Sequence, residues 1–281
     1  VAGPGFINFF LTPTFFVTAN EKIIDDGSQY GNNTHLKGQK TIIEYTDPNP
    51  FKEFHIGHVM SNTIGESIAR LQFANGAEIK KACYSGDKGI HVAKAVAYKL
   101  HTNVEWITIR DVADSYAGGA KLYDEDEEFK HFVVEVNKKI YLEDDQEVFD
   151  VYAFGRKLTL DHFETIYKTL GTQFDYYFFE STTGEFGKEL VKEHVGSIFE
   201  ESEGAIIFRG ETRDVKLHTR VFINKEGIPT YEAKELGLAK VKYDTYPYES
   251  SIVITGNEVN DYFRVLMSAL SEIFPDLAKK T

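Results

Sequence analysis

The chain has 281 residues, of which 42% are hydrophobic, and this is enough for one large domain or two modest ones. The composition excludes collagen-like, low-complexity and disordered proteins. The formal net charge of −13 argues against a protein that coats nucleic acid with its whole surface. The single cysteine, Cys83, allows no internal disulfide, so we expect a cytoplasmic protein. No apolar run is long enough to predict a membrane helix.

More than half of the negative charge lies in residues 121–150, which carry four lysines and eleven acids. A run such as Asp124–Glu128 is typical of a solvated helix face. The rest of the chain is only mildly acidic. The net charge therefore does not exclude a local phosphate site.

The first 40 residues read as an entry segment. Residues 3–5 predict a turn, residues 6–11 a short strand with alternating apolar side chains, and the glycines and asparagines that follow a loop. We expect this segment to be a linker.

Residues 41–110 predict strands and helices in alternation. The expected elements are a strand at 41–46, a helix at 57–73, a strand at 78–84 and a helix at 90–100. A strand, a crossover helix and a second strand form a βαβ unit, which predicts a parallel sheet.

The pattern becomes helical and charged between 111 and 200, with helical spacing at 120–141, 146–157, 160–170 and 186–200. A strand at 174–180 interrupts it. Residues 201–281 return to the mixed pattern, with strands at 204–208, 217–224 and 251–255 and helices at 231–239 and 259–272. The fold class is therefore α/β, a parallel sheet split by a mainly helical insertion.

The most informative stretch is Pro48–His58, which ends in His-Ile-Gly-His between the first strand and its helix. In an open α/β sheet this is the ligand-binding edge. Gly57 lets the backbone approach a ligand, and the helix start offers free N–H groups to phosphate. His55 and His58 are three residues apart, so both can face a phosphate chain and stabilise its charge.

This stretch resembles the His-Ile-Gly-His element of class I aminoacyl-tRNA synthetases. The sequence of residues 44–62 resembles that of the arginyl-tRNA synthetases in particular. Further segments resemble the same family, namely Val1–Phe9, Ser85–Gly89, Phe178–Ser181, Pro229–Glu235 and Thr255–Glu258. The resemblance implies a Rossmann-like class I catalytic domain. It makes 1–40 a linker from a missing N-terminal domain, 41–110 and 201–281 the two catalytic halves, and 111–200 the insertion.

The resemblance also implies the reaction, in which arginine and ATP form arginyl-adenylate and the arginyl group passes to tRNA(Arg). ATP with Mg²⁺ enters as substrate, and no metal held by the protein is expected. We expect a monomer. The implied catalytic residues are Lys52, His55 and His58. The implied ATP-binding residues are His55, Gly57, His58, Gly256 and Asn257, and the implied arginine-binding residues are Asp47, Asn49, Glu180, Tyr231, Glu235 and Glu258.

An arginine pocket needs several acceptors, because guanidinium is a planar cation with five N–H donors. By resemblance, Asn49 and Glu180 hold the α-amino end, and Tyr231, Glu235 and Glu258 surround the guanidinium. Asp47, Glu235 and Glu258 depart from the family, which usually has Ser, Asp, and Gln or His there. Asp87 is either a turn former or a site residue.

The family's second ATP loop, of the Lys-Met-Ser-Lys kind, has no counterpart at Met60 or Met267. We therefore expect a catalytic-domain fragment that is impaired in turnover. Two alternatives stay open. One is another class I synthetase or a nucleotidyltransferase, and the other is a non-catalytic module that binds a ligand without activating it.

Overall fold

The computed structural model describes residues 3–281, apart from the side chain of Glu258. Val1 and Ala2, at the start of the predicted linker, and the predicted contact of Glu258 lie outside the described residues. A parallel four-stranded sheet forms the centre, in the order β3-β2-β1-β7. Its strands are β1 (Lys40–Glu44), β2 (Glu78–Ser85), β3 (Tyr176–Phe179) and β7 (Ser250–Val253).

The predicted βαβ unit is confirmed. Helix α2 (Ile56–Ala74) connects β1 to β2, and the two strands pair in parallel with Ile42 opposite Lys80. Ile42 and Ile43 are fully buried, as a sheet covered on both faces requires. The helix α3 (Ile90–Thr102) follows β2.

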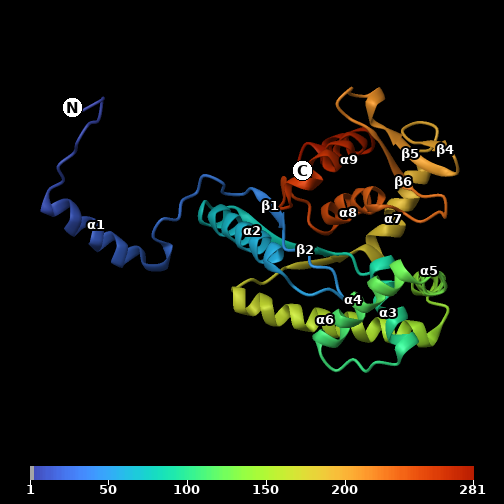
Figure 1. Ribbon diagram of the computed structural model, residues 1–281. Coiled ribbons are helices and arrows are strands. Elements are labelled where there is room, and N and C mark those ends of the chain that lie inside the picture. The colour runs from blue at the N-terminus through green and yellow to red at the C-terminus, as the bar shows by residue number, and fades with distance from the viewer. Residues whose placement is uncertain (1–2) are drawn as a thin grey trace.

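Helices fill the chain between β2 and β3. They are α4 (Ile109–Glu125), α5 (Glu127–Leu142) and α6 (Gln146–Leu170), and together with α3 they enclose a core of their own around Val96, Trp106 and Val133. In Figure 1 this group lies on one side of the sheet. Helix α6 is continuous where the sequence predicted two helices, since Leu158 and Thr159 do not break it. β3 lies within the range predicted as the insertion, yet it pairs with β2 in the central sheet.

The helices that follow β3 pack on the other side. They are α7 (Glu180–Glu193), α8 (Tyr231–Thr245), α9 (Asn260–Ile273) and α10 (Pro275–Ala278). A small antiparallel sheet, β4 (Glu200–Ser202), β5 (Ala205–Arg209) and β6 (Thr219–Ile223), lies beside them (Figure 1). Short 3-10 helices lie at Gly27–Gln29, Gly210–Thr212 and Asn257–Val259.

Helices α7 and α8 cross with their backbones almost in contact. A Cβ atom on Gly187 would lie 1.9 Å from the carbonyl oxygen of Ala233, and one on Gly237 would lie 2.4 Å from that of Thr183. Only glycine fits at these two positions. This crossing sets the first turn of α7 beside the first turns of α8, where several predicted site residues lie.

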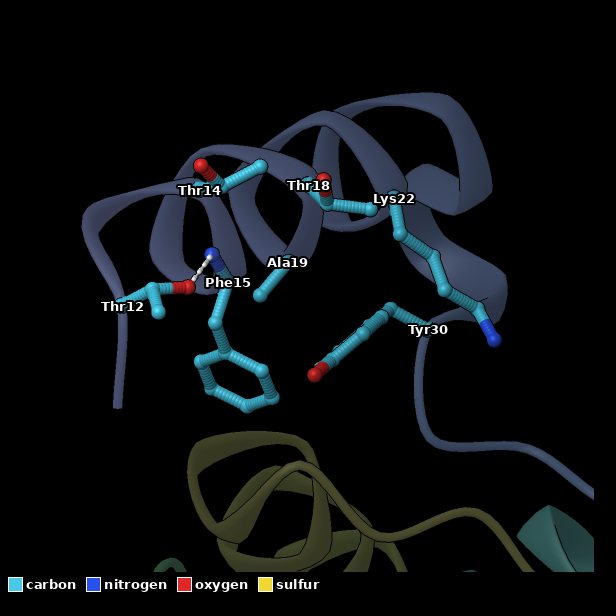
Figure 2. A pocket seen from close by; sticks show the side chains of 7 residues that line it. All are labelled: Thr12, Thr14, Phe15, Thr18, Ala19, Lys22 and Tyr30. Carbon is cyan, nitrogen blue, oxygen red and sulfur yellow. Dashed lines mark hydrogen bonds between the residues drawn. The ribbon is translucent and has the colours of Figure 1, made fainter. Parts of the chain in front are cut away.

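The N-terminal segment differs most from its prediction. Residues 6–11 form no strand element within the described chain, and helix α1 (Pro13–Asp26) stands where a loop was expected. Thr12 caps it by accepting the Phe15 N–H at 3.3 Å, and Pro13 is its first residue, both ordinary start signals. α1 buries no residue and lies away from the rest of the chain (Figure 1). Figure 2 shows Phe15 and Tyr30 projecting to the same side of it, around a shallow cavity lined only by residues 12–30.

Candidate active site

A cavity of about 530 Å³ opens at the carboxyl ends of the central strands. This is the edge at which open parallel sheets bind ligands. β1 and the turn after it contribute Glu44, Asp47 and Asn49. β2 contributes Tyr84, the loop after β2 contributes Gly86, and Glu180 directly follows β3. The lining residues are Glu44, Asp47, Asn49, Tyr84, Gly86, Glu180, Arg220, Tyr231, Glu232, Glu235, Val253, Thr255, Val259, Tyr262 and Phe263.

Five of the six residues predicted for arginine binding line this one cavity, namely Asp47, Asn49, Glu180, Tyr231 and Glu235. They come from the turn after β1 and from the first turns of α7 and α8. Tyr231 is 61% exposed at the rim, and Glu180 is 6% exposed. The structure does not describe the side chain of the sixth, Glu258.

The turn after β1 holds unusual backbone conformations. Thr46 has φ of 81°, Asp47 of 46° and Phe51 of 69°, in the left-handed region that non-glycine residues seldom adopt. Hydrogen bonds hold the turn, since Asp47 Oδ1 accepts the Tyr84 N–H and Asn49 Oδ1 accepts the Gly86 N–H, each at 2.7 Å. Asn49 therefore presents its amide N–H₂ group and the second lone pair of Oδ1 for other contacts.

Within the described part of the chain, only some of the acidic side chains that line the cavity form ion pairs with lysine or arginine. Lys242 donates to Glu44 at 2.7 Å in an ion pair buried on both sides. Burial and the nearby charge of Glu44 raise the pKa of Glu235 to about 8 and raise the pKa of Asp47 well above its usual range. Among the described residues neither carboxyl forms an ion pair. A cation that entered here would therefore meet two carboxyl groups that have no cationic partner in the described structure.

Asp87 is buried and joins three elements. Its carboxylate accepts hydrogen bonds from the backbone N–H of Ser181 at 2.9 Å, from the Ser181 hydroxyl at 2.8 Å and from Arg156 Nε at 2.9 Å. These bonds fix the start of α7, where Glu180 lies. Asp87 does not line the cavity, so its structural role is to position the first turn of α7.

The His-Ile-Gly-His turn forms the start of α2, outside the cavity lining. His55 caps the helix by accepting the Gly57 N–H on its Nδ1, and His58 Nδ1 accepts the His55 N–H. Because both Nδ1 atoms accept, both rings carry their proton on Nε2. The rings stack with centroids 3.7 Å apart, and burial together with His55 lowers the pKa of His58 to about 4. His58 is then a neutral Nε2–H donor near pH 7.

The other residues predicted for ATP binding, Gly256 and Asn257, lie near the start of α2. The Ser61 hydroxyl of α2 donates to the carbonyl of Ile254 at 3.3 Å, which brings the start of α2 beside the segment that carries Gly256 and Asn257. Both of these residues are exposed. Lys52 is half-buried, and its Nζ lies 5.3 Å from the centre of the Tyr116 ring.

Some lining residues were not predicted. Glu44 is the one acid in β1 and directly follows the two buried isoleucines of that strand, and this signal could have identified it. Arg220 of β6 pairs with Glu232 of α8 at 3.1 Å and lies 5.7 Å from the Tyr262 ring centre. No local pattern in the sequence indicates that β6 and α9 reach this cavity.

Within the described residues no group of three or more His, Cys, Asp or Glu side chains is arranged to hold a metal ion. No helix among them has the length and apolar character that a membrane span requires.

Comparison with known proteins decides the family. A protein-family model, described as tRNA synthetases class I (R), catalytic domain, matches residues 20–277. The chain belongs to this family. The predicted fold class, a class I catalytic domain built on a parallel sheet, is thereby confirmed.

Named relatives and solved structures agree with this assignment. The arginine–tRNA ligase of Treponema denticola is 26% identical over 267 residues, covering 90% of this chain and 44% of the relative, and that of Borreliella afzelii is 28% identical over 253 residues, covering 84% and 43%. The fold resembles the arginyl-tRNA synthetase of Plasmodium falciparum with a TM-score of 0.68 at 17% identity, covering 93% of this chain and 46% of that one. For the Thermus thermophilus enzyme the TM-score is 0.65 at 18% identity, with 92% and 50% covered. The chain spans less than half the length of these curated relatives.

Proposed function

We propose that this chain binds arginine in the 530 Å³ cavity and activates it with ATP, as part of an arginine–tRNA ligase. The observation that carries the proposal is the convergence of Asp47, Asn49, Glu180, Tyr231 and Glu235 on that one cavity. The relatives named above carry the same activity in their names.

The two ends of arginine call for different partners. Glu180, beside Asn49, takes the α-ammonium. Glu235, with Asp47 near it, takes the guanidinium, because a carboxylate can accept two parallel N–H bonds from that planar group. Lysine presents a point charge without the fork, so it gains less from the same carboxylates. Tyr231 closes the rim.

ATP, with Mg²⁺ as part of the substrate, binds beside the arginine cavity, at the start of α2. The proposed contacts are the Nε2–H groups of His55 and His58, the free N–H groups around Gly57, and Lys52 for the phosphates, with Gly256 and Asn257 near the nucleoside. The arginine carboxylate attacks the α-phosphorus, arginyl-adenylate forms, and pyrophosphate leaves. The histidines stabilise negative charge that develops on the phosphates. In the complete reaction the arginyl group then passes to the 3′ end of tRNA(Arg), and AMP leaves.

Thermal unfolding with amino acids tests the binding step. We expect arginine at millimolar concentration to raise the Tm, because a ligand that binds only the folded state stabilises it by mass action. Lysine and cysteine should leave the Tm unchanged. No shift with arginine would contradict the assignment of the cavity.

Turnover is tested separately by arginine-dependent exchange of pyrophosphate into ATP, with tRNA present and absent. We expect exchange well below that of a full-length relative. Binding of arginine without any exchange would favour the alternative of a non-catalytic binding module.

A further inference from the structure

Glu180, the proposed acceptor of the α-ammonium group, already has one cationic partner inside the protein. Lys234 Nζ donates to Glu180 Oε2 at 2.6 Å, and the two side chains are only 9% and 5% exposed. The pair joins the first residue of α7 to the first turn of α8. The close crossing at Gly187 and Gly237 makes this short distance possible.

Lys234 contacts Glu180 without lining the arginine cavity. Glu180 lines the 530 Å³ cavity, whereas Lys234 lines a second cavity of about 870 Å³ between α5, α7 and the loop after β6. Tyr231 lines both cavities. The Glu180–Lys234 pair therefore forms part of the wall between them, and Lys234 does not occupy the space that a substrate would fill.

The two oxygens of Glu180 face different surroundings. Oε2 is held by Lys234. Oε1 lies beside Gly86 and Asn49, because a Cβ atom on Gly86 would be 2.9 Å from both Glu180 Oε1 and Asn49 Oδ1. Gly86 and Asn49 both line the arginine cavity. Lys234 thus fixes one oxygen and leaves the other turned toward the cavity.

The remaining charged and titratable groups around Glu180 disfavour its charge or leave it unpaired. They are Asp87 in the loop after β2, Glu235 on α8, and the hydroxyls of Tyr84, Tyr141, Tyr231 and Tyr262 from β2, α5, α8 and α9. Burial raises the pKa of Glu180, Asp87 adds to this, and Lys234 opposes it. Lys234 is the cation that its environment supplies.

We propose that Lys234 is a positioning residue for amino-acid binding, which keeps Glu180 ionised and its Oε1 directed at the substrate's α-ammonium group. The inference rests on the proposed function, since it assigns a role within the same arginine site. It adds a residue that touches no substrate atom and acts only through Glu180.

The test is calorimetric titration with arginine at pH 6, 7 and 8, for the wild-type chain and for Lys234→Met. We expect the variant to bind arginine at least ~10-fold more weakly at pH 6 and less than ~3-fold more weakly at pH 8, because Glu180 without its partner ionises only at higher pH. Lys234→Arg should restore most of the affinity. Lys188→Met is the matched control, since Lys188 lines the same second cavity without contacting Glu180.

A second ligand separates positioning from general damage to the fold. 5-Guanidinopentanoate is arginine without its α-amino group. We expect its affinity to be the same in wild type and Lys234→Met. If both ligands weaken equally, or if the loss for arginine is independent of pH, the positioning role is overturned. Should Lys234→Met fail to fold, Lys234→Gln keeps a donor without the charge, and we expect the same pH-dependent loss.

The outcomes also distinguish the two proposals. A wild-type chain that binds no arginine overturns the proposed function and this inference together. A wild-type chain that binds arginine, with a Lys234→Met variant that binds it equally at every pH, overturns only the inference.

Discussion

Glu235 and Asp47 show how the acidic cavity differs from an ordinary surface cluster of carboxylates. Both are close to Glu44, whose charge is already paired with Lys242 at 2.7 Å. Burial and like charge disfavour ionisation, so the pKa of Glu235 rises to about 8. Near pH 7 the empty cavity therefore holds a proton that a guanidinium group would displace.

This predicts that arginine binding releases protons. We expect the affinity to increase between pH 6 and pH 8, by up to about tenfold per pH unit, because the ionised carboxyl is the form that binds the cation. Calorimetry in buffers with different ionisation enthalpies measures the protons released. Glu235→Gln should reduce the release, and an observed heat that is the same in all buffers would contradict the prediction.

The same shift has a consequence for folding. A carboxyl whose pKa is raised in the folded state binds more protons there than in the unfolded chain between the ordinary pKa of 4.5 and the raised value of about 8. Stability should therefore decrease as the pH rises from 5 to 8. Denaturant unfolding at these two pH values should show a smaller decrease for Glu235→Gln than for wild type, and an equal decrease would contradict the assignment to Glu235.

Sequence motifs predict which residues line the cavity, but they do not predict which of those residues form ion pairs. Asn49, Glu180, Tyr231 and Glu235 each lie within a segment that resembles the family, so all four could be named from the sequence. Glu44 and Lys242 are 198 residues apart, and the pairing of Glu180 with Lys234 also spans two helices. Such pairs depend on how the elements pack, which no local pattern specifies.

The crossing of α7 and α8 determines the geometry of the site at the scale of elements. A Cβ atom added to Gly187 would lie 1.9 Å from the Ala233 carbonyl oxygen. A Cβ atom added to Gly184 would lie 3.5 Å from Lys234 Cγ, which is an ordinary contact distance. The two glycines lie in the same helix, one at the crossing and one beside it.

Gly187→Ala should therefore push the helices apart. We expect it to lower the free energy of unfolding by about 1–3 kcal/mol and to weaken arginine binding, since Glu180 and Glu235 lie on the two helices concerned. Gly184→Ala is the matched control and should be neutral or slightly stabilising, because alanine favours the helix and its Cβ meets only ordinary contacts. Equal stability of the two variants in denaturant unfolding would contradict this account of the crossing.

Elements with a clear hydrophobic period were predictable from the sequence. The strands at 41–46 and 78–84 and the helix between them are β1, β2 and α2 with small shifts at their ends. α1 was missed because its apolar residues indicate no buried face, and indeed none of its residues is buried. The small β4-β5-β6 sheet was only partly visible, since β4 has three polar residues.

At the scale of the whole molecule, the segment before residue 31 contributes little to the packed structure. It exposes large apolar side chains, among them Phe9 at 81% and Phe10 at 96%. The connection to the rest begins at Asn33, whose N–H donates to the Ala74 carbonyl at 2.8 Å, and continues with Leu36 and Asn75.

A chain that starts at Gly31 should accordingly keep its Tm within about 2 °C of wild type and bind arginine equally well, since none of residues 3–30 is buried. A chain that starts at Lys40 should unfold at a lower temperature, because it also loses the contacts of residues 33–39 with the end of α2. Differential scanning calorimetry checks both. A large fall in Tm for the shorter deletion would contradict the independence of this segment.

We propose that the acidic cavity recognises arginine by its guanidinium group. The most direct measurement is calorimetric titration with arginine, lysine and citrulline, which replaces the guanidinium by an uncharged urea of nearly the same shape. We predict a Kd for arginine of about 1 mM or tighter and binding at least ~100-fold weaker for the other two, because lysine lacks the planar fork of N–H donors and citrulline lacks the charge that ionises the buried carboxyls. Citrulline binding as strongly as arginine, or no binding of arginine at all, would contradict the account.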